Sequence, residues 1–541
     1  MKKIFGLILV FILSFWSVKS LIGRGYFPIH DDTQVARVIA MGNALKNGQF
    51  PVRWVSDLGY GYGYPLYNFY GPLPYYLGGS LYALGVDSVM ATKWMFGIGT
   101  VLAAVTMYFL LYPILGLLAA VTGSMIFLYA PYHAVEVFIR GAVGEYWAIA
   151  FVPFIILGVC KKRLILGALG LAGTILSHTI LGFITTVILS LSILVYLIRK
   201  SDWYLLSLVV LGLGISAFFW LPALVEMQYT SINAMITSSA TSFSDHYICL
   251  SQLWNAPWGY GGSAPGCIDG MSLKIGKFHS IVFILSLIIL LINRSVKRLK
   301  KINTIVMIAA FSTIGMIFLT LPYSSFLWNI FPMTRFLQYP WRLLSFVIIG
   351  IGITGAYLVA SWKAPIVRFF IGAVIIVSTI MINAKLFVPQ YQYLRDSNQF
   401  ETKDELRFRV SKISDEYLPP GIIKPEVVTD IQTSVVFGTD ELTVKARQER
   451  DTFVYIELES NTAQNVTIRK AWFPGWSITL NGNRVTPHIE NGFPSVNIEE
   501  GMSIIQMRFT NTPIRTIANS ISVITMITMI FFIIYGKKTN A

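Results

Sequence analysis

Long apolar runs, separated by short polar or basic clusters, recur along most of the chain. Runs of roughly 17 to 25 residues predict helices that cross a bilayer. They fall near residues 4–22, 88–112, 114–131, 144–160, 163–179, 180–198, 204–222, 279–293, 303–321, 341–361, 365–388 and 516–535. The pattern predicts a polytopic α-helical membrane protein with about twelve crossings. The first run follows "MKK", and because no small-residue cleavage site comes after it, we expect a retained helix.

The segment 389–515 has a different pattern. "TFVYIELES", "NVTIRKAWF", "WSITLNGNRV" and "SIIQMRFTN" alternate apolar and polar residues, which is typical of half-buried strands. "NGN" at 481–483 and "ENG" at 490–492 are hairpin-type turns. The sequence therefore predicts three parts: a transmembrane domain 1–388 with a polar loop 23–87, a β-sandwich or jelly-roll-like domain 389–515, and a last helix with a tail, 516–541.

Basic clusters set the expected orientation. Lys and Arg gather at 2–3, 161–163, 199–200, 293–301, 363–368 and 537–538, which lie on one side if there are about twelve crossings. We therefore expect a bacterial cytoplasmic (inner) membrane protein with both termini cytoplasmic, and with loop 23–87 and the β domain outside.

The composition agrees with this class. The chain is 55% hydrophobic and only 13% charged, and its formal net charge of +15 is spread over the connecting clusters. This distribution favours a lipid bilayer as partner and no nucleic acid. Of the three cysteines, Cys249 and Cys267 share one polar loop. They are either a disulfide, if the loop faces an oxidising compartment, or two free thiols.

The stretch "HDDTQVARVIAMGNALKNGQF" places His30, Asp31 and Asp32 before a short amphipathic helix that we expect at the membrane interface. One Asp would cap this helix. A single cap needs a single Asp, and carboxylates at membrane depth usually mark a site, so we expect a functional role for at least one of the pair.

Other polar residues fall on the same predicted outer side. They are Arg53, His133, Arg140, Glu145, His178, Arg335 and Arg342. The histidines are either satisfied interfacial residues or groups that orient a base, and the arginines either snorkel to headgroups or bind phosphate. The tyrosine- and glycine-rich stretch 53–79 is either an aromatic belt or a stacking surface for sugars. There is no Walker A loop, no G-x-G-x-x-G after a strand, and no H-E-x-x-H.

Several stretches resemble, in order, the bacterial membrane-protein family titled 6-pyruvoyl-tetrahydropterin-synthase-related. They are "HDDTQVARVIAMGNALKNGQFPVRWVSDLGYGYGYPLYNFYGPLPYYLGG", "YAPYHAVEVFIRGAVGEYWAIAFVPFI", "LSHTILGF", "FLQYPWRLLSF" and "DEYLP". The layout of an acid pair in the first outer loop, many helices and an outer C-terminal domain is similar to the GT-C superfamily of polyprenyl-phosphate-dependent glycosyltransferases.

The GT-C resemblance implies transfer of a sugar from a polyprenyl-phosphate donor to a cell-envelope acceptor on the outer face. It implies Asp31 or Asp32 as general base or as ligand of a divalent cation. Residue type and predicted sidedness make His30, His133 and His178 candidates for orienting the base or for stabilising the leaving phosphate. Arg53, Arg140, Glu145, Arg335 and Arg342 are then candidates for binding the substrate and its phosphate. Two alternatives stay open: a flippase for lipid-linked saccharides, and a membrane protein that binds envelope glycan without turnover.

Overall fold

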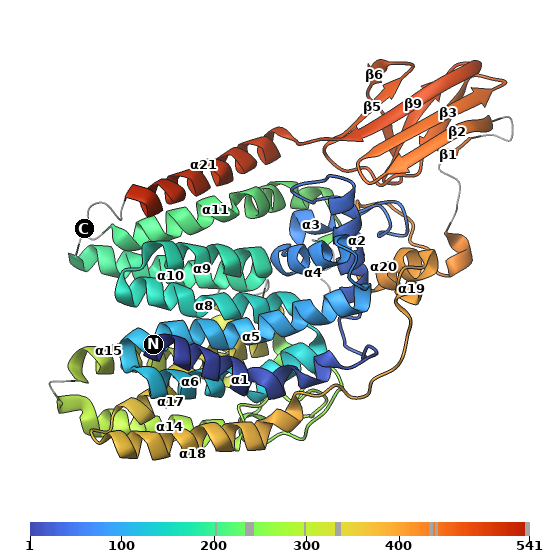
Figure 1. Ribbon diagram of the computed structural model, residues 1–541. Coiled ribbons are helices and arrows are strands. Elements are labelled where there is room, and N and C mark those ends of the chain that lie inside the picture. The colour runs from blue at the N-terminus through green and yellow to red at the C-terminus, as the bar shows by residue number, and fades with distance from the viewer. Residues whose placement is uncertain are drawn as a thin grey trace. The chain divides into compact units, whose positions relative to one another are not determined.

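The computed structural model describes residues 1–200, 203–232, 243–296, 299–330, 337–431, 436–438 and 442–535. The chain divides into two units (Figure 1). The first unit comprises residues 1–31, 93–216 and 238–394, and the second comprises 32–92, 217–237 and 395–541. Each unit is therefore assembled from three separate stretches of sequence.

The first unit is helical. Its main helices are α1 (Lys2–Ile22), α5 (Ser88–Leu115), α6 (Leu117–Leu128), α7 (Pro131–Val135), η1 (Glu136–Arg140), α8 (Val143–Lys161), α9 (Leu164–Ser177), α10 (Thr179–Lys200), α11 (Tyr204–Glu226), α14 (Lys277–Ile292), α15 (Lys300–Thr320), η9 (Pro340–Leu343), α17 (Leu344–Ala360) and α18 (Pro365–Asn383); α5 begins and α11 ends in the second unit. Shorter helices, α13 (Leu250–Trp254) and α16 (Ser325–Ile330), lie in its connections.

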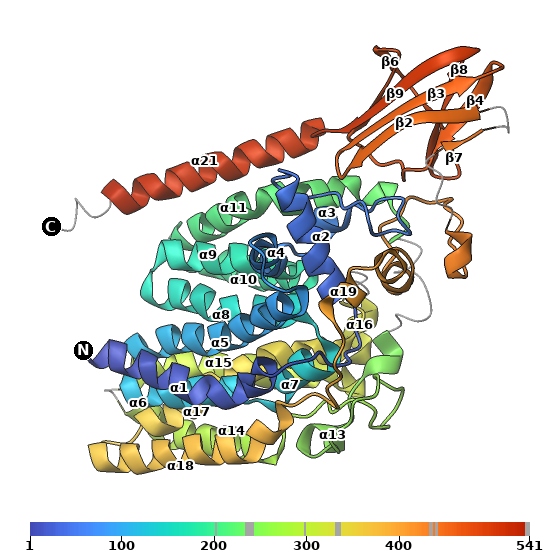
Figure 2. The ribbon, with the colours of Figure 1, turned by 45° about the vertical axis from the view of Figure 1, so that its right-hand side comes forward.

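Helix α17 is the buried centre of this unit. It packs against α6, α14 and α15, and nearly all of its residues are buried. Figures 1 and 2 show α14, α17 and α18 running side by side. Small residues permit this packing, since a Cβ added at Gly123 of α6 would lie 2.7 Å from the Gly352 carbonyl oxygen.

The described residues contain nine helices that are long and apolar enough to cross a membrane. The bent pair Leu117–Leu128 and Pro131–Arg140, which turns by 47°, makes a tenth if it is one span. Two shorter apolar helices, Leu164–Ser177 and Thr179–Ser192, match the predicted runs 163–179 and 180–198. The chain is a multi-pass helical membrane protein, as its apolar runs predict.

The predicted runs 114–131 and 144–160 leave residues 131–145 as a connecting loop on the outer side, and the structure differs from this expectation. Residues 131–140 form a buried helical continuation across the bend, not an exposed loop. The charged side chains of this stretch, Glu136 and Arg140, pair with each other, and Arg140 also pairs with Glu145, which allows these charges to be buried.

The second unit combines helices with a C-terminal β domain. Its helices are α2 (Gln34–Lys46), α3 (Leu66–Phe69), α4 (Leu73–Ala83), α19 (Ser397–Phe400), η11 (Glu405–Val410), α20 (Ser411–Ile413) and the long apolar α21 (Pro513–Tyr535). Its strands are β1 (Val436–Phe437), β2 (Leu442–Arg450), β3 (Phe453–Ser460), β4 (Gln464–Ile468), β5 (Trp476–Leu480), β6 (Asn483–Val485), β7 (His488–Glu490), β8 (Phe493–Ile498) and β9 (Gly501–Phe509).

The strands form two antiparallel sheets, ordered β1-β4-β8-β7 and β2-β3-β9-β5-β6. Figure 2 shows β2, β3 and β9 side by side. Burial alternates along β3, as expected for a strand with one face on a core. Asn481 and Gly482 (φ 50° and 83°) close the β5–β6 hairpin, and Asn491 and Gly492 (φ 48° and 78°) close β7–β8, at the two predicted turns.

Two expectations for this unit differ from the structure. Among the described residues the first strand begins at Val436, whereas the β-rich segment was predicted from 389; residues 397–413 hold α19, η11 and α20. Helix α2 is buried along most of its length, so it is not an exposed interfacial helix. Its Arg37 places its guanidinium 4.0 Å from the Tyr70 ring centre and donates to Ser414 Oγ at 3.1 Å.

Candidate functional site

The histidine and first aspartate of the "HDD" stretch are fixed through their backbone. His30 N donates to the Ile139 carbonyl at 2.9 Å, and Asp31 N donates to the Arg140 carbonyl at 3.0 Å. Gly141, the residue after Arg140, adopts φ 64°, and a Cβ added to it would lie against Ile29. The end of η1 therefore holds Asp31 in a defined place within the first unit.

The side chain of Arg140 belongs to a buried charge cluster, which consists of Glu136, Arg140, Glu145 and Arg342. Arg140 donates to both oxygens of Glu145, at 2.7 and 2.9 Å, and to Glu136 Oε1 at 2.7 Å. Arg342 Nε donates to Glu145 Oε1 at 3.1 Å. Two arginines and two glutamates sum to zero formal charge, which is how such groups are accommodated at membrane depth.

Aromatic rings flank both guanidinium groups of this cluster. Arg140 lies 4.6 Å from the ring centre of Trp341, and Arg342 lies 4.8 Å from that of Tyr339. The two rings stack on each other with centroids 4.9 Å apart. Arg342 Nη1 also donates to the Leu337 carbonyl and to Gln338 Oε1. The cluster is thus packed and bonded on several sides.

The three candidate histidines have different surroundings. His178 Nδ1 accepts from Leu181 N at 3.2 Å, and its Nε2 lies 3.9 Å from Glu145 Oε1, so it borders the charge cluster while it caps α10. His133 is fully buried, with its ring among Phe127, Tyr146 and Phe387. His30 is exposed, and its Nε2 lies 3.0 Å from the Tyr260 carbonyl oxygen.

Asp32 belongs to the second unit and is ion-paired. Arg409 Nη1 donates to Asp32 Oδ2 at 2.9 Å, and Arg409 also binds Glu405, which Arg395 contacts at 2.8 Å. Burial raises the pKa of the Asp32 carboxyl above its ordinary value, although Arg409 opposes the shift. For Glu405 the hydrogen bonds from Arg409 and Arg395 outweigh burial and lower the pKa.

The two aspartates therefore differ in their partners. Within the part of the chain that the structure describes, no hydrogen bond or ion pair engages the Asp31 carboxylate, which is only partly buried. Neither Asp caps α2, because the N-cap position is Thr33. The predicted N-cap is therefore wrong. The backbone N–H of Asp31 donates to the Arg140 carbonyl instead, and the side chain of Asp32 pairs with Arg409.

Arg53 lies in a second buried network, within the second unit, and not in the charge cluster around Glu145. Its guanidinium donates to Asn68 Oδ1 and Asn519 Oδ1, both at 3.0 Å. Asn68 in turn donates to Glu226, which forms an ion pair of 3.0 Å with Arg515. Burial, then the nearby Arg515, lowers the pKa of Arg53 to about 10.

Sequence reasoning missed several members of these networks. Glu226 ends an apolar run, and an acid at that position is a signal that the sequence offers. Arg409 and Glu405 carry no comparable signal, because they lie in a charged segment.

Three further predicted features are placed as follows. Arg335 lies outside the described residues. Cys249 and Cys267 form a disulfide with Cα atoms 5.5 Å apart. Many tyrosines of the stretch 53–79 are buried, with ring contacts such as Tyr67 to Tyr75 at 5.6 Å. Among the described side chains, no group of three or more His, Cys, Asp or Glu has a geometry that could hold a metal ion.

Comparisons with known proteins add little at the level of sequence. No family model matches the chain, and no curated protein matches it. Among solved structures, the chain is similar to the cryo-EM structure of the arabinofuranosyltransferase AftD from Mycobacteria, at 13% identity and a TM-score of 0.47. The match covers 73% of this chain but only 27% of AftD, so this chain spans about a quarter of that protein. A similarity at this level does not support a function for this chain.

Proposed function

We propose that the protein is a membrane glycosyltransferase of GT-C type. It would transfer a sugar from a polyprenyl-phosphate donor to a cell-envelope acceptor on the outer face of the cytoplasmic membrane, with Asp31 as general base. The observation that carries the proposal is the contrast within the acid pair: Asp32 is held by Arg409, whereas the Asp31 carboxylate has no partner among the described residues. A base must be able to accept the proton of an incoming hydroxyl.

In this reaction the Asp31 carboxylate takes the proton of the acceptor hydroxyl, and the acceptor oxygen bonds to the anomeric carbon. The bond from that carbon to the phosphate oxygen breaks, and the polyprenyl phosphate leaves with the electron pair. The reactive carbon of a lipid-linked sugar lies at the headgroup plane, so the base must lie there too. The expected location of loop 23–87 at the outer membrane surface supports this role.

The charge cluster supports the base indirectly. Arg140 is engaged by both Glu136 and Glu145, so we assign it, with Glu145, a positioning role: it fixes the turn whose carbonyl holds the Asp31 amide. Arg342 differs from Arg140 in that no described residue accepts a hydrogen bond from its Nη2. We assign that group to the departing phosphate, on which charge develops.

Transfer in detergent tests this function. Purified protein is incubated with a panel of radiolabelled polyprenyl-phosphate sugars and cell-envelope fractions, with and without chelator, and the labelled product is counted. We expect transfer from at least one donor. A flippase would show no turnover without a sealed bilayer, so absence of transfer from every donor, with movement of donor across liposomes, would replace this proposal by transport.

A further inference from the structure

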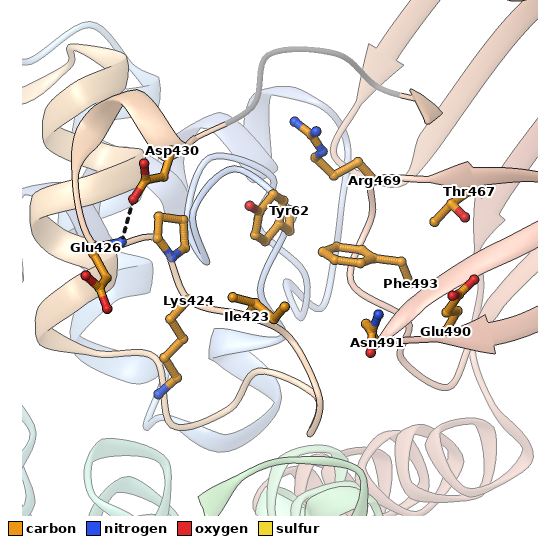
Figure 3. Close-up of a pocket in the computed structure, with 11 residues that line it drawn as sticks. Tyr62, Ile423, Lys424, Glu426, Asp430, Thr467, Arg469, Glu490, Asn491 and Phe493 are labelled. Carbon is orange, nitrogen blue, oxygen red and sulfur yellow. Dashed lines mark hydrogen bonds between the residues drawn. The ribbon is translucent and has the colours of Figure 1, made fainter. Parts of the chain in front are cut away.

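A pocket of about 570 Å³ lies within the second unit (Figure 3). It is bounded by the segment 423–430, by the four-stranded sheet at β4, β7 and β8, and by the tyrosine-rich stretch. A cavity of roughly 300–1,000 Å³ is the usual size of a small-molecule site. None of the residues discussed above as base or phosphate ligand lines it.

The hairpin side of the pocket is held in place by its backbone. Trp472 N donates to the Gly492 carbonyl at 2.8 Å, and Ala471 N donates to the Tyr62 carbonyl at 2.8 Å. A Cβ at Gly492 would lie 2.5 Å from Ile422, so the β7–β8 turn packs closely against the chain that leads into 423–430. Only a glycine fits there.

The opposite wall is also ordered by hydrogen bonds. The Asp430 carboxylate accepts from the backbone N–H groups of Glu426 and Val427, both at 3.0 Å, which closes the loop 426–430. Lys424 forms an ion pair of 2.8 Å with Asp415. The pocket is therefore pre-organised, so a ligand would not have to order these walls when it binds.

The floor and the rim offer different chemistry. The rings of Tyr62 and Phe493 meet edge to face with centroids 5.0 Å apart, and Figure 3 shows them in the middle of the pocket. Glu490, Asn491 and Thr467 lie on the side of the sheet. Aromatic faces beside carboxylate, amide and hydroxyl groups suit a ligand with apolar C–H faces and many hydroxyl groups.

The charges argue against an anionic ligand. Three carboxylates, Glu426, Asp430 and Glu490, line the pocket, against two cations, Lys424 and Arg469. Lys424 is already neutralised by Asp415. A phosphate or a uronic acid would meet a surplus of negative charge, whereas an uncharged hydroxyl can donate to a carboxylate.

We propose that this pocket binds a neutral saccharide unit of a glycan, with a sugar face against Tyr62 and Phe493 and a hydroxyl donated to Glu490. Burial raises the pKa of the Tyr62 hydroxyl, so Tyr62 stays protonated and can donate as well. The inference does not depend on the proposed transfer, because a saccharide site serves an enzyme and a non-catalytic glycan-binding protein equally.

Glycan binding by the purified full chain tests the assignment. The detergent-solubilised protein is screened against an array of neutral and uronic-acid oligosaccharides, and the affinity for the strongest neutral probe is then measured by calorimetry. We expect Glu490→Gln to weaken binding about tenfold, roughly the effect of one charged hydrogen bond. Phe493→Leu should weaken binding by a similar factor, because it removes the aromatic face. The matched control is Glu499→Gln, an exposed carboxylate just after β8 and outside the pocket, which should bind as wild type does.

Three results would overturn the assignment: no neutral oligosaccharide binds, uronic acids bind more tightly than neutral probes, or Glu490→Gln binds as well as Glu499→Gln. Glu490 is exposed, so its substitution should not impair folding even if Phe493→Leu does. Asp31→Asn should retain oligosaccharide binding, because Asp31 does not line the pocket. Failure of sugar transfer together with intact binding would remove the proposed enzyme and leave the pocket standing.

Discussion

Glu145 is the centre of the buried charge cluster, and Glu145→Gln tests whether that cluster holds the first unit together. The carboxylate accepts three hydrogen bonds, two from Arg140 and one from Arg342. The substitution leaves the shape almost unchanged but turns a neutral buried cluster into one with an excess positive charge. Removing one partner of a buried ion pair costs about 3–5 kcal/mol, and we expect a loss within this range.

Glu136→Gln is the matched control for this substitution. Glu136 accepts a single hydrogen bond from Arg140, and Arg140 keeps both of its bonds to Glu145. This variant also leaves one excess positive charge in the cluster, but it removes one charge-assisted hydrogen bond where Glu145→Gln removes three, so we expect a smaller loss of about 1.5–3 kcal/mol. In the double variant Glu145→Gln with Arg342→Met the excess charge disappears, so its loss should be smaller than the sum of the two single losses.

Unfolding by SDS titration in mixed micelles, followed by tryptophan fluorescence, gives the four free-energy differences, for Glu145→Gln, Glu136→Gln, Arg342→Met and the double variant. Trp341 lies against Arg140 and so reports on the cluster. The reasoning fails if Glu145→Gln and Glu136→Gln agree to within about 0.5 kcal/mol, or if the double variant is simply additive.

Burial raises the pKa of Asp32, so the folded state holds this proton more tightly than the unfolded state does, and stability falls as pH rises through the window above about 3.9. Asp32→Asn should flatten this dependence in melting curves collected from about pH 4 to pH 7, and an unchanged slope would contradict the shift. The disulfide closes a loop with a sequence separation of 18 residues, so Cys249→Ser with Cys267→Ser should cost about 3 kcal/mol. Limited proteolysis should then cut the 249–267 loop faster than in wild type, and equal rates would show that the bridge is not needed. Glu226→Gln leaves the buried Arg53 and Arg515 without a carboxylate, so about 3–5 kcal/mol of stability should be lost, whereas the exposed Glu500→Gln should stay within about 0.5 kcal/mol of wild type.

Features that depend on local sequence could be predicted. Apolar runs of sufficient length fall at every long helix, and the alternation in "TFVYIELES" falls on β3. The "NGN" and "ENG" turns close hairpins because Asn481 and Asn491 tolerate positive φ and Gly follows each of them.

Features that depend on distant partners could not be predicted. Asp32 and Arg409 are 377 residues apart in the chain, and no local pattern pairs them. The polar stretch 131–140 is typical of a loop, and it is buried because Arg140 pairs with Glu136 and Glu145, while Glu145 also pairs with the distant Arg342. Likewise, the buried position of Arg37 depends on Ser414, which lies in another part of the sequence.

Comparison of Asp31→Asn with Asp32→Asn in the sugar-transfer assay tests the central claim most directly. The claim predicts that Asp31→Asn lowers the transfer rate about 10²- to 10⁴-fold, as expected for loss of a general base, while donor binding is kept. Asp32→Asn should lower it far less, because Asp32 is occupied by Arg409. Equal rates in Asp31→Asn and wild type, or a larger loss in Asp32→Asn, would contradict the assignment of Asp31 as the base.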